Sequence, residues 1–101
     1  MCIVEDKDSK KFYLSSGTIK HIKYFHKIDN PESFVKRVLK SPLAIVESKW
    51  EENTYLYYAQ KGKQLYSVVV VDTTHKRIKT AYLERKIKEG KVIWVSPKLM
   101  N

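Results

Sequence analysis

The sequence predicts a single α+β domain in which two N-terminal helices pack on a four- to five-stranded antiparallel sheet. The chain has 101 residues, the usual size of one domain, and 43% of them are hydrophobic, enough for a buried core. Apolar residues recur at helical spacing as far as Leu39, and from Leu43 onward they alternate with polar residues instead. Helices that precede a run of strands are typical of the α+β class. We therefore expect residues 1–101 to form one domain.

The N-terminal part predicts a polar lead-in followed by a short helix. Residues 1–17 are largely polar, and residues 11–14 within them could form a short strand. Apolar residues and His26 then recur at helical spacing over residues 18–26, which predicts the first helix. Asp29-Asn30-Pro31 interrupts this pattern and ends the helix before Ile28.

The second helix has the clearest local signals. Asn30 can cap it, Pro31 suits the first helical position, and Ser41-Pro42 ends it, because the residue before proline is disfavoured in a helix. Its predicted core-facing residues share one face at helical spacing: Phe34, Val35, Val38 and Leu39.

The remaining sequence predicts a meander of strands. Period-two patterns separated by turn residues cover residues 43–50, 54–60, 65–72, 77–83 and 92–95. The four consecutive valines of Val68–Val71 predict a central strand that is covered on both faces.

The composition narrows the classes of function. With 20 Lys and Arg against 11 Asp and Glu, the chain has a formal net charge of +9. Such a surplus attracts polyanions, either nucleic acid or an acidic membrane surface, although it also occurs on proteins that bind neither. Cys2 is the only cysteine and the three histidines have no companion cysteines, so we expect no disulfide, no zinc site and no cofactor. Without a signal-peptide pattern or a long apolar run, we expect the cytoplasm as the location.

Two histidines near the first helix are the first candidates for chemistry. His21 and His26 can accept or donate protons near neutral pH, as cleavage of a phosphodiester requires. On a regular helix, residues five apart point about 140° away from each other. Both can therefore serve one phosphate only if His26 lies on a frayed last turn. The alternative is that either histidine caps the helix or fills a gap in the core.

Two hydroxyls on the strand over residues 77–83 form the second candidate. Strict alternation would place Ile78, Thr80 and Tyr82 on one face of the sheet. Thr80 and Tyr82 could then hold a phosphate, or Tyr82 could stack on a base. The alternative is a Thr/Tyr pair that only stabilises the sheet.

Basic residues interspersed with aromatic residues form the third candidate. This combination is typical of surfaces that bind single-stranded RNA, although solvated lysines give the same pattern. The residues that we expect to contact RNA are Lys20, Lys23, Tyr57, Arg77, Arg85 and Lys86.

Taken in order along residues 18–95, these patterns resemble the phage and mobile-element group of the barnase–EndoU–colicin–RelE-like (BECR) ribonuclease fold. The segments that carry the resemblance are His21–His26, Ser41-Pro42 before Ile45–Ser48, Tyr55–Tyr58, the valine strand, Ile78–Tyr82 and Lys88–Trp94. The resemblance implies two helices on a four-stranded sheet and metal-independent RNA cleavage that leaves a cyclic phosphate. It also implies that His21 and His26 match the helix histidines of the family and that Thr80 and Tyr82 match its polar pair. Arg77, Arg85 and Lys86 would bind phosphates.

The leading hypothesis is therefore a small metal-independent endoribonuclease, of the kind encoded as a toxin or by a mobile element. The expected partners are RNA and, for a toxin, a cognate antitoxin or inhibitor protein, with no membrane and no nucleotide cofactor. Two alternatives stay open: a non-catalytic RNA-binding module, and a structural or partner-binding protein of a mobile element.

Overall fold

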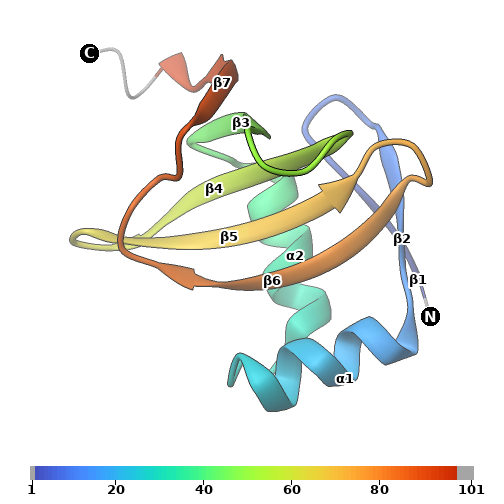
Figure 1. Cartoon of the computed structure of the whole chain (residues 1–101). Coiled ribbons are helices and arrows are strands. Elements are labelled where there is room, and N and C mark those ends of the chain that lie inside the picture. The colour runs from blue at the N-terminus through green and yellow to red at the C-terminus, as the bar shows by residue number, and fades with distance from the viewer. Residues whose placement is uncertain (1, 98–101) are drawn as a thin grey trace.

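The chain folds around one seven-stranded mixed sheet with two short helices between its second and third strands (Figure 1). The computed structural model describes residues 2–97. The elements in chain order are β1 (Cys2–Glu5), β2 (Lys11–Leu14), α1 (Ser16–Phe25), α2 (Pro31–Lys40), β3 (Ala44–Ser48), β4 (Thr54–Gly62), β5 (Leu65–Asp72), β6 (Arg77–Glu84) and β7 (Gly90–Val95). Neither helix in this part of the chain has the length or the apolar character needed to span a bilayer.

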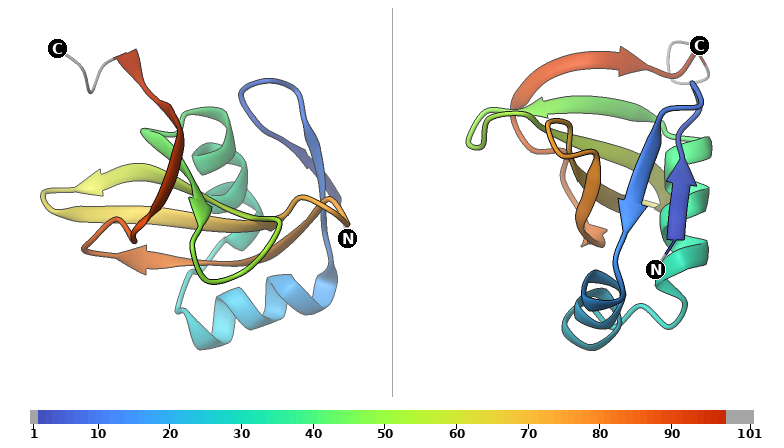
Figure 2. Two further views of the ribbon diagram at one scale, coloured as in Figure 1. Left: turned by 45° about the horizontal axis from the view of Figure 1, so that its top comes forward. Right: turned by 90° about the vertical axis from the view of Figure 1, so that its right-hand side faces the viewer.

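The order of the strands is β1-β2-β6-β5-β4-β3-β7. Neighbouring strands are antiparallel except β2 and β6, which run parallel and meet at Tyr13 and Arg77. The sheet is strongly twisted and curved, so that its two ends lie in very different planes (Figure 2). This architecture contradicts the predicted four- to five-stranded antiparallel sheet with both helices ahead of it.

The N-terminal hairpin is the first reason for the difference. Strands β1 and β2 are four residues each, and the buried side chains Val4, Phe12 and Leu14 alternate with polar or exposed ones. Both segments lie in the predicted polar lead-in. The strand considered possible at residues 11–14 is present as β2, whereas β1 was not predicted, because four residues are too few to show a clear pattern. The hairpin adds two strands to the sheet and makes it mixed.

The last strand is the second reason. A meander would place β7 beside β6, but the chain crosses the end of the sheet and β7 pairs antiparallel with β3 instead (Figure 1). Gly90 allows the close approach. A Cβ atom there would overlap the carbonyl oxygen of Glu47 and would lie 2.7 Å from Cγ1 of Val46.

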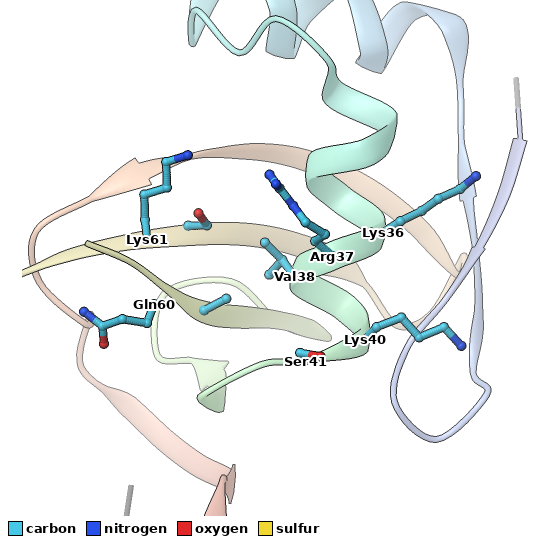
Figure 3. Close-up of a pocket in the computed structure, with 9 residues that line it drawn as sticks. Lys36, Arg37, Val38, Lys40, Ser41, Gln60 and Lys61 are labelled. Atoms are coloured by element: carbon cyan, nitrogen blue, oxygen red, sulfur yellow. The ribbon is translucent and has the colours of Figure 1, made fainter. Parts of the chain in front are cut away.

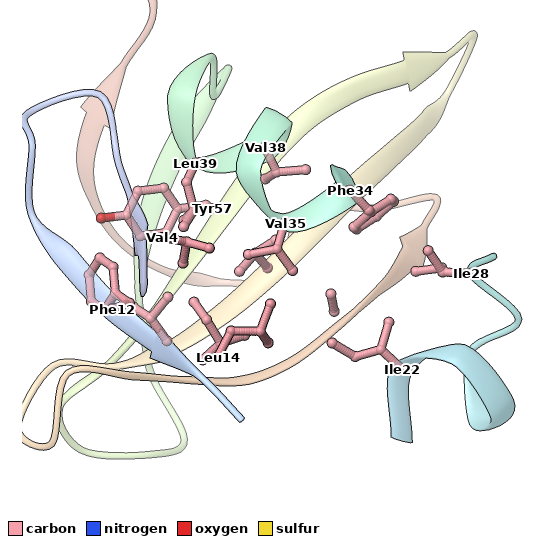
Figure 4. Close-up of a cluster of buried hydrophobic side chains, with 14 of the residues drawn as sticks. Val4, Phe12, Leu14, Ile22, Ile28, Phe34, Val35, Val38, Leu39 and Tyr57 are labelled. Carbon is pink, nitrogen blue, oxygen red and sulfur yellow. The ribbon is translucent and has the colours of Figure 1, made fainter. Parts of the chain in front are cut away.

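Helix α2 packs on one face of the sheet, as its sequence predicted. The side-chain oxygen of Asn30 accepts a hydrogen bond from the backbone N–H of Ser33 at 3.2 Å, which confirms the predicted cap. The predicted stripe is buried against β4, β5 and the N-terminal hairpin: Phe34, Val35, Val38 and Leu39. It belongs to the larger cluster of buried side chains, the helix-side core, which lies between the helices and the sheet (Figure 4). Helix α1 lies beside β6 and contributes Ile22 to the same core.

Strand β5 occupies the middle of the sheet and confirms the interpretation of the valine run. Val69 and Val71 face the helix-side core, whereas Val68 and Val70 belong to a second cluster that also contains Tyr58. All four valines are buried. Both faces of the central strand are therefore covered.

Candidate functional site

The end of helix α1 brings the two candidate histidines together. Helix α1 ends at Phe25, and His26 is its C-cap with φ −105° and ψ 3°, while its N–H still donates to the carbonyl of Ile22 at 3.1 Å. Because His26 has left the helical path, its ring can turn back toward His21. The two ring centroids are 5.0 Å apart with an interplanar angle of 74°. This is the arrangement that the sequence required if both histidines were to act on one group.

Aromatic and basic side chains from three parts of the chain surround this pair. The ring of Phe25 stacks on His21 with centroids 4.9 Å apart, and the ring of Tyr82 lies 5.7 Å from that of His26. The ammonium group of Lys88 is 5.5 Å from the centroid of the Tyr82 ring. We call His21, Phe25, His26, Tyr82 and Lys88 the histidine cluster.

The cluster combines a neutral proton acceptor with positive charge. Burial lowers the pKa of His26 from its ordinary value of 6.5, and the neighbouring His21 lowers it further. His26 is therefore held in its neutral form at pH 7, in which one ring nitrogen can accept a proton. His21 is exposed and His26 half-buried, so the pair lies at the surface. A ligand from solution can reach it.

The loop that carries Lys88 is fixed to the sheet. The backbone N–H of Lys88 donates a hydrogen bond of 3.0 Å to the hydroxyl of Tyr58, whose side chain is fully buried in the second cluster. A buried anchor of this kind limits the movement of the loop. The backbone from which the Lys88 side chain reaches Tyr82 is thus held in place.

A β-bulge sets which side chains of β6 face the cluster. The register of β5 and β6 shifts between Val70 and Val71, so that Lys79 is the extra residue. Ile78 therefore faces the helix-side core, and only Thr80 and Tyr82 share the other face. The predicted alternation of all three on one face is wrong, because a bulge reverses the pattern.

Thr80 is close to the cluster in sequence but its hydroxyl is buried. Its Oγ1 has no hydrogen-bond partner within residues 2–97. In this conformation a phosphate could not reach that oxygen, so Thr80 supports the sheet near Tyr82 rather than a ligand.

Two of the residues expected to contact RNA lie away from the cluster. Tyr57 is only 2% exposed, and its hydroxyl donates to the carboxylate of Asp6 at 2.7 Å, so its ring is part of the core. Arg77 lies at the opposite end of β6 from Tyr82, and its Nε is 3.5 Å from the carboxylate of Asp72. His75 contacts the same carboxylate at 2.9 Å, in the turn before β6.

The other four basic residues are exposed on the elements that carry the cluster. Lys20 and Lys23 lie on α1, and Arg85 and Lys86 lie in the loop between β6 and Lys88. None of the four is a member of the ion pairs found within residues 2–97. Their charges are therefore available to an anionic ligand.

The sequence interpretation did not single out Phe25 and Lys88 as members of the site. Phe25 is four residues after His21, a spacing that puts two side chains side by side on a helix, and this signal could have identified it. Lys88 is one of the basic residues interspersed with aromatic ones in the sequence, but its place near the Tyr82 ring depends on the path of the loop after β6.

No group of three or more His, Cys, Asp and Glu side chains within residues 2–97 is placed to hold a metal ion. No protein-family model matches the chain, and no curated protein and no solved structure matches it significantly. The histidine cluster is therefore the feature of the molecule that indicates a function.

Proposed function

We propose that the protein is an endoribonuclease that cleaves RNA by attack of the ribose 2′-hydroxyl on the adjacent phosphate. The observation that supports this most directly is the pairing of His21 and His26, with ring centroids 5.0 Å apart and with the pKa of His26 lowered. Cleavage by this route needs one base and one acid near the same phosphate. A pair of neighbouring histidines, one of them kept neutral, can supply both.

In the proposed reaction, neutral His26 takes the proton of the 2′-hydroxyl while the oxygen forms a bond to phosphorus. Protonated His21 gives a proton to the 5′-oxygen as the bond between that oxygen and phosphorus breaks. The products are a 2′,3′-cyclic phosphate and a free 5′-hydroxyl, and each histidine ends in the opposite protonation state. The step consumes no cofactor, and proton exchange with water restores the enzyme.

The surrounding side chains would stabilise the charge and hold the substrate. The ammonium group of Lys88 lies 5.5 Å from the centroid of the Tyr82 ring. It could compensate the negative charge that develops on the phosphate oxygens. Phe25 is 76% exposed and is already stacked on His21, so its free face can receive a base. Arg85 and Lys86 precede Lys88 and would contact the neighbouring phosphates.

The proposal rests on this cluster and not on the architecture that the BECR resemblance implied. That architecture has two helices on a small antiparallel sheet, whereas this chain has a seven-stranded mixed sheet. The toxin or mobile-element role, the cognate inhibitor and the cytoplasmic location stay predictions.

The test is cleavage of a single-stranded RNA pool by purified protein in EDTA, with analysis of the ends. We expect cyclic-phosphate ends, and a rate that falls by about 10²–10⁴-fold in His26→Ala and His21→Ala. His75→Ala is the matched control, since His75 is exposed in a turn and bonds to Asp72, away from the histidine cluster. It should keep the wild-type rate. Equal cleavage by all four proteins would assign the activity to a contaminant and refute the proposal.

The pH dependence provides a second readout. A general base must be neutral, and the pKa of His26 lies below 6.5. Loss of the base should therefore not reduce the rate as the pH falls toward 6.5, and a decline is expected only at lower pH, where His26 becomes protonated. A rate that already declines between pH 8 and pH 7 would assign the base to another group.

The exposed rings also support one alternative, a non-catalytic RNA-binding module. Tyr24 and Phe25 are 64% and 76% exposed beside Lys20 and Lys23, and stacking on them needs no proton transfer. Binding without cleavage, unchanged in the His21 and His26 variants, would select this alternative.

A further inference from the structure

A groove lies between helix α2 and the β4–β5 hairpin, away from the histidine cluster (Figure 3). Its volume is about 590 Å³, within the range of ligand-binding pockets. Its lining residues come from the second half of α2 and from the ends of β4 and β5 near the hairpin turn: Lys36, Arg37, Val38, Lys40, Ser41, Ala59, Gln60, Lys61 and Ser67. Four of these nine residues are basic and none is acidic.

Two of the four cations have no carboxylate partner within residues 2–97. Lys36 pairs with Glu32 at 3.3 Å and Lys40 with Glu5 at 3.5 Å, and both side chains point away from the groove in Figure 3. Arg37 and Lys61 take part in none of the ion pairs of this part of the chain. They extend in the same direction from opposite walls (Figure 3). An anion bound in the groove would therefore be attracted by both charges.

The wall formed by β5 adds a polar group that the fold itself does not use. Ser67 is 6% exposed and lines the groove, and its hydroxyl takes part in no side-chain hydrogen bond within the described residues. Unlike Oγ1 of Thr80, this hydroxyl is not an enclosed atom without a partner, so it is open to a ligand in the groove. A phosphate oxygen between Arg37 and Lys61 could accept its hydrogen bond.

We propose that this groove binds the phosphate backbone of single-stranded RNA through Arg37, Lys61 and Ser67. The choice of RNA as the ligand rests on the proposed function. A guanidinium group can bind two phosphate oxygens at once, and the ammonium and hydroxyl groups complete a set of donors typical of backbone contacts. The apolar lining residues favour RNA over a membrane, since Val38 is buried and Ala59 is small, which leaves no large side chain to insert into lipid.

The groove and Tyr82 of the histidine cluster lie near the same part of the sheet but on opposite faces. Ser67 is followed directly by Val68, and Val68 is the cross-strand partner of Tyr82. Ser67 faces α2, whereas Val68 and Tyr82 belong to the second cluster. An RNA strand that contacts both Ser67 and Tyr82 would therefore pass around the edge of the sheet. The groove would hold a segment distant from the cleaved phosphate.

The test is the salt dependence of binding to a fluorescent 2′-O-methyl oligoribonucleotide, measured by anisotropy. This probe has no free 2′-hydroxyl and cannot be cleaved by the proposed reaction. For single strands the slope of log K against log salt is about −0.7 per phosphate contact. The double variant Arg37→Gln/Lys61→Gln should therefore bind more weakly, with a slope that is less steep by about 1.4.

The matched control is Lys10→Gln/Lys76→Gln, which removes the same charge from two exposed lysines that lie outside the groove and the cluster and belong to none of the ion pairs within residues 2–97. Its slope should stay near that of the wild type. Equal slopes for the groove variant and the wild type would refute the proposal that the groove binds RNA. Equal reductions of the slope in the groove variant and the control variant would refute it as well. Thermal melting confirms that both are folded.

The two proposals can fail separately. Cleavage of RNA with an unchanged slope in the groove variant would refute the groove alone. A less steep slope without any cleavage would refute the ribonuclease and keep the groove as an RNA-binding site. Loss of binding to phosphatidylserine vesicles, with oligonucleotide binding unchanged, would assign the groove to lipid headgroups and overturn the choice of RNA.

Discussion

Replacement of Tyr57 by phenylalanine removes one hydroxyl from a buried contact between the N-terminal hairpin and the centre of the sheet. Asp6, in the turn between β1 and β2, is 1% exposed, and its carboxylate accepts three hydrogen bonds. Two come from the backbone N–H groups of Asp8 and Lys10, both at 2.9 Å, and the third from Tyr57 at 2.7 Å. Burial, and then the bond to Asp6, raise the pKa of Tyr57 above its ordinary value of 10. The hydroxyl therefore stays a donor even in alkaline solution.

The expected cost follows from the charge of the acceptor. A hydrogen bond to a charged group contributes about 1.5–3 kcal/mol, and the two backbone donors remain to solvate Asp6 in the variant. We therefore expect Tyr57→Phe to lower the free energy of unfolding by about 1.5–3 kcal/mol, or the melting temperature by on the order of 10 °C.

The assay is urea unfolding followed by circular dichroism, with Tyr55→Phe as the control. Tyr55 lies on the same strand and packs on the same core, but its hydroxyl takes part in no side-chain hydrogen bond within residues 2–97. A double-mutant cycle with Asp6→Asn isolates the interaction energy of the pair. Equal losses in Tyr57→Phe and Tyr55→Phe, or no loss in either, would show that the contact does not stabilise the fold.

Two further substitutions test the core and the position of the last strand. Phe34 is 4% exposed in the helix-side core, so Phe34→Ala should cost about 3–5 kcal/mol in urea unfolding, and superimposable curves would contradict its burial. Gly90→Ala should cost about 1–3 kcal/mol, because the added Cβ would overlap the backbone of β3. Gly62→Ala is its control, since a Cβ there has no neighbour within 4 Å, and equal stability of both alanine variants would refute the close pairing of β3 and β7.

The sequence was sufficient to predict the elements whose signals are local. Helix α2 has a cap, a proline and an apolar stripe within a dozen residues, and all three act as expected. In strand β5, the four consecutive valines indicate by themselves that both faces of the strand are buried. In both cases neighbouring residues carry the whole signal, so that no knowledge of the tertiary structure is needed.

The elements that depend on distant partners could not be predicted in the same way. Strands β1 and β2 have only four residues each, too few to show a clear pattern, and Val4 and Leu14 are buried because they join a core built with distant segments. Likewise, nothing within β7 indicates that β3 is its partner rather than β6. The mixed seven-stranded sheet is therefore a property of long-range pairing.

For the candidate site, too, local features could be predicted from the sequence and features that depend on tertiary structure could not. Histidine chemistry identified His21 and His26 as candidates, but their contact depends on the backbone angles of a single capping residue. Tyr57 was misassigned to the surface, because β4 is buried on both faces and alternation cannot show which tyrosine is exposed. The bulge at Lys79 likewise depends on the partner strand.

The strand order also determines when the protein can fold during synthesis. The N-terminal hairpin is made first, yet it attaches to the sheet through β6, and β3 acquires its outer neighbour only when β7 has been made. Contacts between such distant segments form slowly, because a long loop must close before they stabilise the chain. The nascent chain therefore leaves the ribosome with unpaired strand edges until nearly the whole domain is complete. Over that interval it depends on its own charge, or on chaperones, to avoid aggregation.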